Sequence, residues 1–213
     1  HQEDVGRFAV KVLAFTDPHG APEAADAVIE LAKSSRPDLV VCSGDISYFQ
    51  KRYERMCRRL ADLCCPIYWV SGNHDAGIED LVGVEFLHMK DVSFLVADLH
   101  KATVGGVPGS EKFWPSKEWD DDLVNLALRT YGRISRSKPF IFLSHFPPTG
   151  SSITGYSGGC PDAGGSQTVR EIVDVLHPDL VISGHYHSDF RQQCKIGPTR
   201  VVNPGPMGTV YEL

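Results

Sequence analysis

Short apolar runs that end in potential metal ligands are the feature that most constrains the fold of this chain. The runs are 12–15, 39–42, 67–70, 140–143 and 180–182, and they are followed by Asp17 and His19, by Asp45, by Asn73, by His145, and by His185 and His187. Such runs predict buried strands, and helical segments between them predict βαβ units. Because parallel strands end at one edge of an open α/β sheet, the sequence predicts a functional site there.

These polar residues are interpreted together rather than one at a time. A single histidine after an apolar strand is more often a hydrogen-bonded structural residue than a ligand. Seven such side chains at five strand ends would each need a separate structural explanation, because buried Asp, Asn and His are costly unless they are paired or bind metal. Carboxylate, amide and imidazole groups without a thiolate are typical of a transition-metal site. We therefore interpret the set as a metal centre.

The order of these segments resembles the calcineurin-like metallophosphoesterase superfamily. The matching segments are Asp17-Pro18-His19, Gly44-Asp45, Gly72-Asn73-His74-Asp75, His145 before Phe146-Pro147-Pro148, and Gly184-His185-Tyr186-His187. The alternating strands and helices alone predict only an α/β fold. The resemblance implies an αββα sandwich of two mixed β-sheets flanked by helices. The length of 213 residues predicts a single domain over residues 1–213, with 1–7 as a disordered or non-native start.

The resemblance also implies a ligand set for two divalent metal ions. Asp45 bridges the ions, Asp17, His19 and His187 complete one site, and Asn73, His145 and His185 complete the other. These ligands suit Mn, Fe, Zn, Ni or Co, and manganese is our first choice. Two metals roughly 3.5 to 4 Å apart lower the pKa of a bridging water, so that hydroxide can attack phosphorus near neutral pH.

Two further residues of the third segment are candidate catalytic groups. His74 is not itself a ligand in the family, which implies that it protonates or stabilises the leaving oxygen. Asp75 would accept the other ring N–H of His74 and hold that tautomer. A plain helix N-cap before residues 76–81 explains Asp75 equally well.

The subclass follows from the residues beside the ligands. Protein phosphatases of this superfamily carry Gly-Asp-x-x-Asp-Arg-Gly, whereas this chain has Gly44-Asp45-Ile46-Ser47-Tyr48. Gly-Asn-His-Asp is instead similar to cyclic nucleotide phosphodiesterases and related enzymes. We expect a phosphodiesterase that acts on small nucleotide-like or aryl substrates. The alternatives are a phosphomonoesterase and, less favoured because every ligand is present, a non-catalytic metal-binding scaffold.

Composition limits the partners and the compartment. A formal charge of −6 argues against general nucleic-acid binding, which depends on clustered Lys and Arg. No stretch approaches the roughly 20 apolar residues of a membrane span, so we expect a soluble protein without a membrane partner. The six cysteines form no regular framework, which predicts reduced thiols and a cytoplasmic location. The sequence leaves open the oligomeric state and a targeting segment before His1.

The remaining patterns predict the other elements. The expected strands are 8–16, 39–43, 67–71, 92–99, 102–104, 140–144, 180–183, 190–195 and 199–202, and the expected helices are 22–34, 48–63, 117–130 and 167–176. The glycine-rich stretch 149–166 is interpreted as a substrate-facing loop, and the alternative is a loop without a functional role. Five basic residues at 51–59 predict a solvated helix face, with a docking patch for an anionic partner as the other interpretation.

Overall fold

A computed structural model describes residues 9–48, 53–63, 65–75, 95–99, 101–107, 125, 128–133, 138–155 and 164–213. The strands are β1 (Lys11–Phe15), β2 (Leu39–Cys42), β3 (Ile67–Trp69), β4 (Leu95–Asp98), β5 (Thr103–Val107), β6 (Phe140–Ser144), β7 (Leu180–Ile182), β8 (Gln193–Ile196), β9 (Thr199–Val202) and β10 (Thr209–Glu212). The helices are α1 (Pro22–Ser35), α2 (Tyr53–Leu60) and α4 (Gln167–Leu176), with a 3₁₀ turn, η2 (His187–Asp189).

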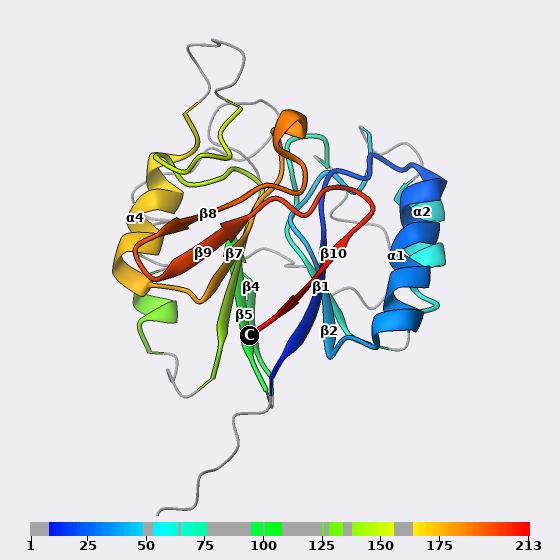
Figure 1. Ribbon diagram of the computed structural model, residues 1–213, viewed down its shortest axis with the longest axis horizontal. Coiled ribbons are helices and arrows are strands. Elements are labelled where there is room, and N and C mark those ends of the chain that lie inside the picture. Colours follow the sequence, from blue (N-terminus) through cyan, green and yellow to red (C-terminus); the bar gives the residue numbers. More distant parts are fainter. Residues whose placement is uncertain are drawn as a thin grey trace, which may run out of the picture.

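Two sheets form the centre of the molecule (Figure 1). The first has the strand order β10-β1-β2-β3, and the second has the order β4-β5-β6-β7-β9-β8. In the first sheet β1, β2 and β3 are parallel and β10 is antiparallel to β1. In the second, β5, β6, β7 and β9 are parallel, while β4 and β8 pair antiparallel to their neighbours. Both sheets are therefore mixed.

Helices cover the outer faces of the two sheets, so the layers run α-β-β-α as the resemblance implies. Figure 1 shows α1 and α2 on one side of the molecule and α4 on the other. Alternate residues of one strand serve different layers: Val12 packs between the sheets, whereas Leu13 packs under the helices. Burial on both faces explains why the strands are continuous apolar runs instead of alternating ones.

Helix α4 coincides with the expected helix 167–176 because its signals are local. The Ser166 side chain accepts a hydrogen bond from the Val169 N–H at 3.0 Å, which caps the helix at its first turn. The helix buries Val169, Ile172, Val173 and Leu176. In the described part of the chain, no helix is long and apolar enough to cross a membrane.

The structure corrects several predicted boundaries. Strand β5 continues through Gly105 and Gly106, where the sequence suggested that the strand had ended. Tyr131 explains this, because its hydroxyl bonds both the N–H and the carbonyl of Gly106, at 3.0 and 3.1 Å. The strand expected at 190–195 begins at Gln193, since η2 precedes it. Strand β10 was not predicted.

The helix expected at 48–63 is helical over Tyr53–Leu60, and residues 49–52 lie outside the described part. Of the helix expected at 117–130, positions 117–124, 126 and 127 also lie outside the described part, while 125 and 128–131 are helical. The disordered start expected at 1–7 also falls outside the described residues.

Candidate metal centre

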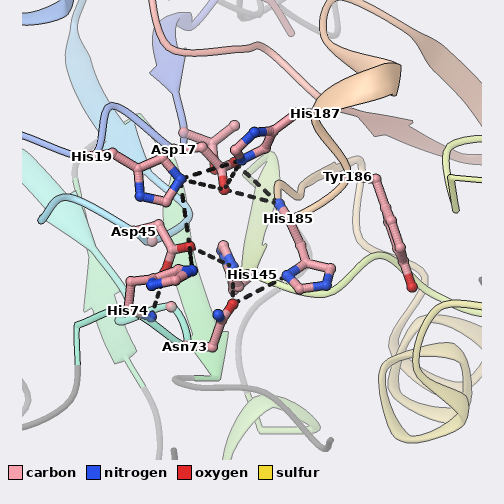
Figure 2. A network of polar contacts seen from close by, with 12 residues as sticks. Asp17, His19, Asp45, Asn73, His74, His145, His185, Tyr186 and His187 are labelled. Carbon is pink, nitrogen blue, oxygen red and sulfur yellow. Dashed lines mark hydrogen bonds and ion pairs between the residues drawn. The ribbon is translucent and has the colours of Figure 1, made fainter. Parts of the chain in front are cut away.

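Strand register brings the predicted ligands to one edge. Phe15 pairs with Cys42, and Cys42 pairs with Trp69, so the first three strands of the first sheet end at the same level. In the second sheet Leu143 pairs with Ile182. The connecting loops are bonded together: the Asp17 N–H donates to the Gly44 carbonyl at 3.0 Å. Figure 2 shows that all seven predicted ligands and His74 lie together at this edge.

Asp17, His19 and His187 form what we call the outer group. The Nε2 atom of His187 lies 3.5 Å from Asp17 Oδ1 and 3.2 Å from His19 Nε2. The side chain of His187 is 54% exposed and that of His19 is 22% exposed. Two donor atoms bound to one ion at 2.0–2.2 Å lie about 3 to 3.5 Å apart. The separations in the outer group therefore suit one metal ion.

Asn73, His145 and His185 form the inner group. Asn73 Oδ1 lies 2.9 Å from His145 Nε2 and 3.1 Å from His185 Nδ1. His145 is fully buried, and its Nδ1 lies 3.0 Å from the Ser43 carbonyl oxygen. A ring that donates its Nδ1 proton to that carbonyl directs the Nε2 lone pair at the site, as metal-binding histidines do.

Asp45 lies between the two groups. Its Oδ2 atom is 3.8 Å from His19 Nε2 in the outer group and 3.4 Å from His145 Nε2 in the inner group. Its Oδ1 atom accepts the backbone N–H of His74 at 2.9 Å, which fixes the carboxylate. One carboxylate that faces both groups can serve two metal ions.

The backbone at the site is unusual. Asp17, His19, Asp45 and His185 have φ values of 53°, 46°, 52° and 67°, in the left-handed region. Non-glycine residues rarely adopt this conformation, and each instance costs on the order of 1–3 kcal/mol. Strain of this kind is concentrated at functional sites, and four of the seven proposed ligands carry it.

Gly184 and Gly44 allow the loops to approach one another closely. A Cβ atom on Gly184 would collide with Thr16 Oγ1 and Asp17 Oδ2. Gly44 has a φ of +109°, and a Cβ there would lie 2.6 Å from the Gly72 backbone nitrogen. Larger residues at these two positions would push the ligand loops apart.

Charge and burial set the pKa values of the site groups. Burial alone would lower the pKa of His145, but the Asp45 carboxylate beside it raises that pKa to about 9. Burial would raise the pKa of Asp45, yet His145 lowers it to about 2. Two effects lower the pKa of His185 to about 3: burial, which contributes most, and the charge of His145. Asp45 and His145 thus form a buried ion pair when no metal is bound.

Asp75 has a structural role that sequence reasoning did not identify. Its Oδ2 accepts the Gly72 N–H at 2.8 Å, and its Oδ1 accepts the Ser47 N–H at 3.0 Å. Burial, with a further contribution from Asp45, raises the Asp75 pKa to about 6. The carboxylate therefore ties the loop after β2 to the loop after β3. The alternative helix at 76–81 lies outside the described residues, and the contact with the His74 ring stays a prediction.

Aromatic side chains support the imidazoles and were also missed. Phe146 packs on His185 with ring centroids 4.1 Å apart, and Phe190 stacks on His187 at 5.0 Å with an interplanar angle of 27°. The position of Phe146 directly after His145 was the available signal. No sequence signal indicated the role of Phe190, because its contact with His187 depends on the η2 turn.

The loop expected to face the substrate starts beside the site. The Gly155 N–H donates to Asp189 Oδ2 at 2.6 Å, and a Cβ on Gly155 would lie 2.5 Å from Tyr186 Cδ1. Positions 156–163 of this loop lie outside the described residues.

In the basic segment, Arg58 pairs with Glu54 at 3.2 Å and Arg59 pairs with Asp26. These pairs favour the solvated helix face over the docking patch. Lys51 and Arg52 fall outside the described part of the chain.

Comparisons with known proteins give matches in sequence and in fold. The family model for calcineurin-like phosphoesterases matches residues 10–189. A Synechococcus sp. protein named as a probable cyclic nucleotide phosphodiesterase is 27% identical over 187 residues, 80% of this chain and 66% of the relative. A Pseudoalteromonas sp. protein with the same description is 23% identical, over 91% of this chain and 72% of its own length.

A solved structure from Thermus thermophilus superposes with a TM-score of 0.65. The two chains are 19% identical, and the match covers 93% of this chain and 90% of the other. At this identity the likeness shows the fold alone.

Proposed function

The chain belongs to the calcineurin-like phosphoesterase family and is a phosphoric ester hydrolase, and from this premise we propose that it is a two-metal phosphodiesterase for small substrates. The observation that carries the proposal is the position of Asp45, whose Oδ2 faces His19 Nε2 at 3.8 Å and His145 Nε2 at 3.4 Å. Such a carboxylate suits a pair of ions that share one ligand.

The family uses divalent metal ions, and our proposal assigns one ion to each of the two groups. Asp17, His19 and His187 would hold one ion, Asn73, His145 and His185 would hold the other, and Asp45 would contact both. When bound, the ions activate a water molecule and neutralise charge on the phosphoryl oxygens. Carboxylate and amide oxygens suit manganese, which remains our first choice among Mn, Fe, Zn, Ni and Co.

His74 is proposed to protonate the leaving oxygen. Its Nε2 lies 4.0 Å from Asp45 Oδ2, on the side of the site where His19 also lies (Figure 2). The side chain is 24% exposed, so a substrate can reach it. The hydrogen bond from its backbone N–H to Asp45 Oδ1 ties the proposed acid to the proposed bridging ligand. A leaving oxygen near His74 would therefore be near the metals as well.

Asp75 is proposed to position these groups. It holds the Ser47 and Gly72 amides together, and those amides flank Asp45 and Asn73 in the chain. A carboxylate that accepts backbone N–H groups in a buried site fixes loop geometry.

A preference for diesters is supported by two observations. Ile46, Ser47 and Tyr48 follow Asp45, so this segment lacks the Arg that phosphatases use to meet the additional charge of a monoester. Both curated relatives are named as probable cyclic nucleotide phosphodiesterases. The runner-up is a phosphomonoesterase of the same family. We also propose a cytoplasmic location, supported by the free thiols of Cys42, Cys57 and Cys194.

The test is a substrate panel with controlled metal content. Protein treated with chelator is reloaded with Mn, Ni, Zn or Mg and assayed on matched aryl monoesters, aryl diesters and cyclic nucleotides. We expect two metals per chain, loss of activity on chelation, and a higher kcat/KM for the diester. Full activity in excess chelator with no bound metal would refute the two-metal proposal, and a clear preference for the monoester would favour the runner-up.

A further inference from the structure

Tyr48 is a half-exposed aromatic side chain at the edge of the metal centre. It lies three residues after Asp45, and 51% of its surface is exposed. Its ring stacks on His74, with centroids 5.0 Å apart and an interplanar angle of 18°. It also lies edge-on to His19 at a centroid distance of 5.9 Å. The ring therefore borders a proposed metal ligand and the proposed acid.

The backbone that carries Tyr48 is held in place. Ile46 is fully buried. The Ser47 N–H and hydroxyl both donate to Asp75 Oδ1, at 3.0 and 3.3 Å. Because the preceding residue is fixed, the backbone that carries the ring is held beside the site, which lowers the entropy lost on binding.

The second tyrosine beside the site is placed differently. Tyr186 packs on His185 and on Phe146, with centroid distances of 4.8 and 5.8 Å. Gly155 approaches its ring so closely that a Cβ there would lie 2.5 Å from Cδ1. Tyr186 lies on the opposite side of the site from His74 (Figure 2). Packing around Tyr186 serves the fold, whereas Tyr48 presents half of its surface to solvent next to His74.

We propose that Tyr48 is a substrate-positioning residue that stacks on a flat ring of the leaving group, so that this site prefers esters of phenols and nucleosides over aliphatic esters. The inference rests on the proposed function. When the leaving oxygen lies within reach of His74, the group attached to that oxygen lies beside the Tyr48 ring, because this ring packs on His74. A planar substituent offers that ring a second stacking partner, and stacking of this kind tolerates any flat π-system.

A kinetic test compares two leaving groups of matched acidity. Methyl phenyl phosphate has a flat leaving group, and methyl hexafluoroisopropyl phosphate has an aliphatic one whose alcohol is about as acidic as phenol. Tyr48→Leu should lower kcat/KM roughly 10-fold to 100-fold on the phenyl ester and leave the fluoroalkyl ester nearly unchanged. Tyr48→Phe should keep the preference. Val175→Ala, which removes another exposed apolar side chain, is the matched control and should behave as wild type.

Equal losses on both esters would overturn the inference, because a ring that merely orients His74 affects every substrate. A binding experiment separates this inference from the proposed function. Phenylphosphonate and cyclohexylphosphonate are titrated by calorimetry into metal-loaded wild type, Tyr48→Phe and Tyr48→Leu. Wild type and Tyr48→Phe should bind the phenyl compound roughly 10-fold more tightly, at the lower end of the stacking range, and Tyr48→Leu should not discriminate.

Equal affinities in wild type, a preference that survives in Tyr48→Leu, or binding of neither phosphonate would each refute stacking by Tyr48. Failure of wild type to hydrolyse either diester, with the phenyl preference intact in the titration, would refute the proposed function and keep the inference.

Discussion

The outer and inner groups of the proposed metal centre differ in burial and in what holds their imidazoles. His187 in the outer group has a side chain that is 54% exposed, and its ring stacks on Phe190. His145 in the inner group is fully buried and hydrogen-bonded to the Ser43 carbonyl. Electrostatic attraction is stronger where water is excluded, and a fixed ring needs no reorganisation to bind. We therefore expect the inner ion to bind more tightly and the outer ion to exchange more readily.

The largest effect should follow from the residue that belongs to both groups. Asp45→Asn keeps the shape of the side chain but removes the charge that faces His19 and His145. Both metal sites should weaken, and turnover should fall by more than the roughly 10²–10⁴-fold expected for loss of one general acid. Elemental analysis and steady-state kinetics would measure this. A variant with two metals and wild-type turnover would contradict a bridging role.

His74→Ala should separate chemistry from metal binding. Neither group should lose its ion, while turnover falls by roughly 10²–10⁴-fold if His74 is a general acid. The loss should shrink as the leaving group becomes more acidic, because a good leaving oxygen needs no proton in the transition state. Rates over a series of substituted phenyl esters, together with metal content, would check both points. Metal loss with an equal defect on every ester would instead make His74 a ligand.

Much of the fold could be predicted because its signals are local. Strands β6 and β9 coincide with the expected ranges, since runs buried on both faces are apolar throughout. Strand β10 escaped prediction because it is a short strand after Pro206 and Gly208 whose partner, β1, lies near the other end of the chain. Gly105 and Gly106 were misleading for the same reason: Tyr131 keeps them in a strand, and that contact is tertiary.

The candidate site likewise has features that could be predicted from the sequence and features that could not. The meeting of the seven proposed ligands could be predicted because they follow five strands, and strand ends meet at one edge. The hydrogen bonds from the loops to Asp75 could not be predicted, because they depend on which loop lies beside the carboxylate. In this structure that loop carries Ser47. The left-handed backbone of Asp17 and Asp45 was also hidden. Asp adopts this conformation more often than most non-glycine residues, but the residue type alone does not show which Asp does so.

The difference between the inner and outer groups can be tested by the effect of two variants on the free energy of unfolding. In metal-free protein His145→Ala leaves the Asp45 carboxylate buried without its partner, which should lower the free energy of unfolding by about 3–5 kcal/mol. His187→Ala removes an exposed imidazole and should cost about 1 kcal/mol or less. Urea unfolding in chelator would measure both. The outer variant should also keep one metal per chain after dialysis, and equal losses in the two variants would show that the groups do not differ.

The smallest expected effect is a proton released when the inner ion binds. Without metal the pKa of His145 is about 9, because the Asp45 carboxylate outweighs the opposing effect of burial. The ring is therefore protonated at pH 7.5, yet a metal ligand must be neutral. Binding of the first ion should release about one proton, and its affinity should rise about tenfold per pH unit up to pH 9 and level off above it.

His185 should contribute nothing to this release, since burial and the charge of His145 lower its pKa to about 3. Calorimetric titration in buffers of different ionisation enthalpy measures the proton count. His187→Ala is the control that keeps the inner group intact and should release the same proton on binding its first ion. Two results would place the tighter site in the outer group and reverse the comparison. One is a first ion that binds without releasing a proton, and the other is a proton release that is present in wild type but absent in His187→Ala.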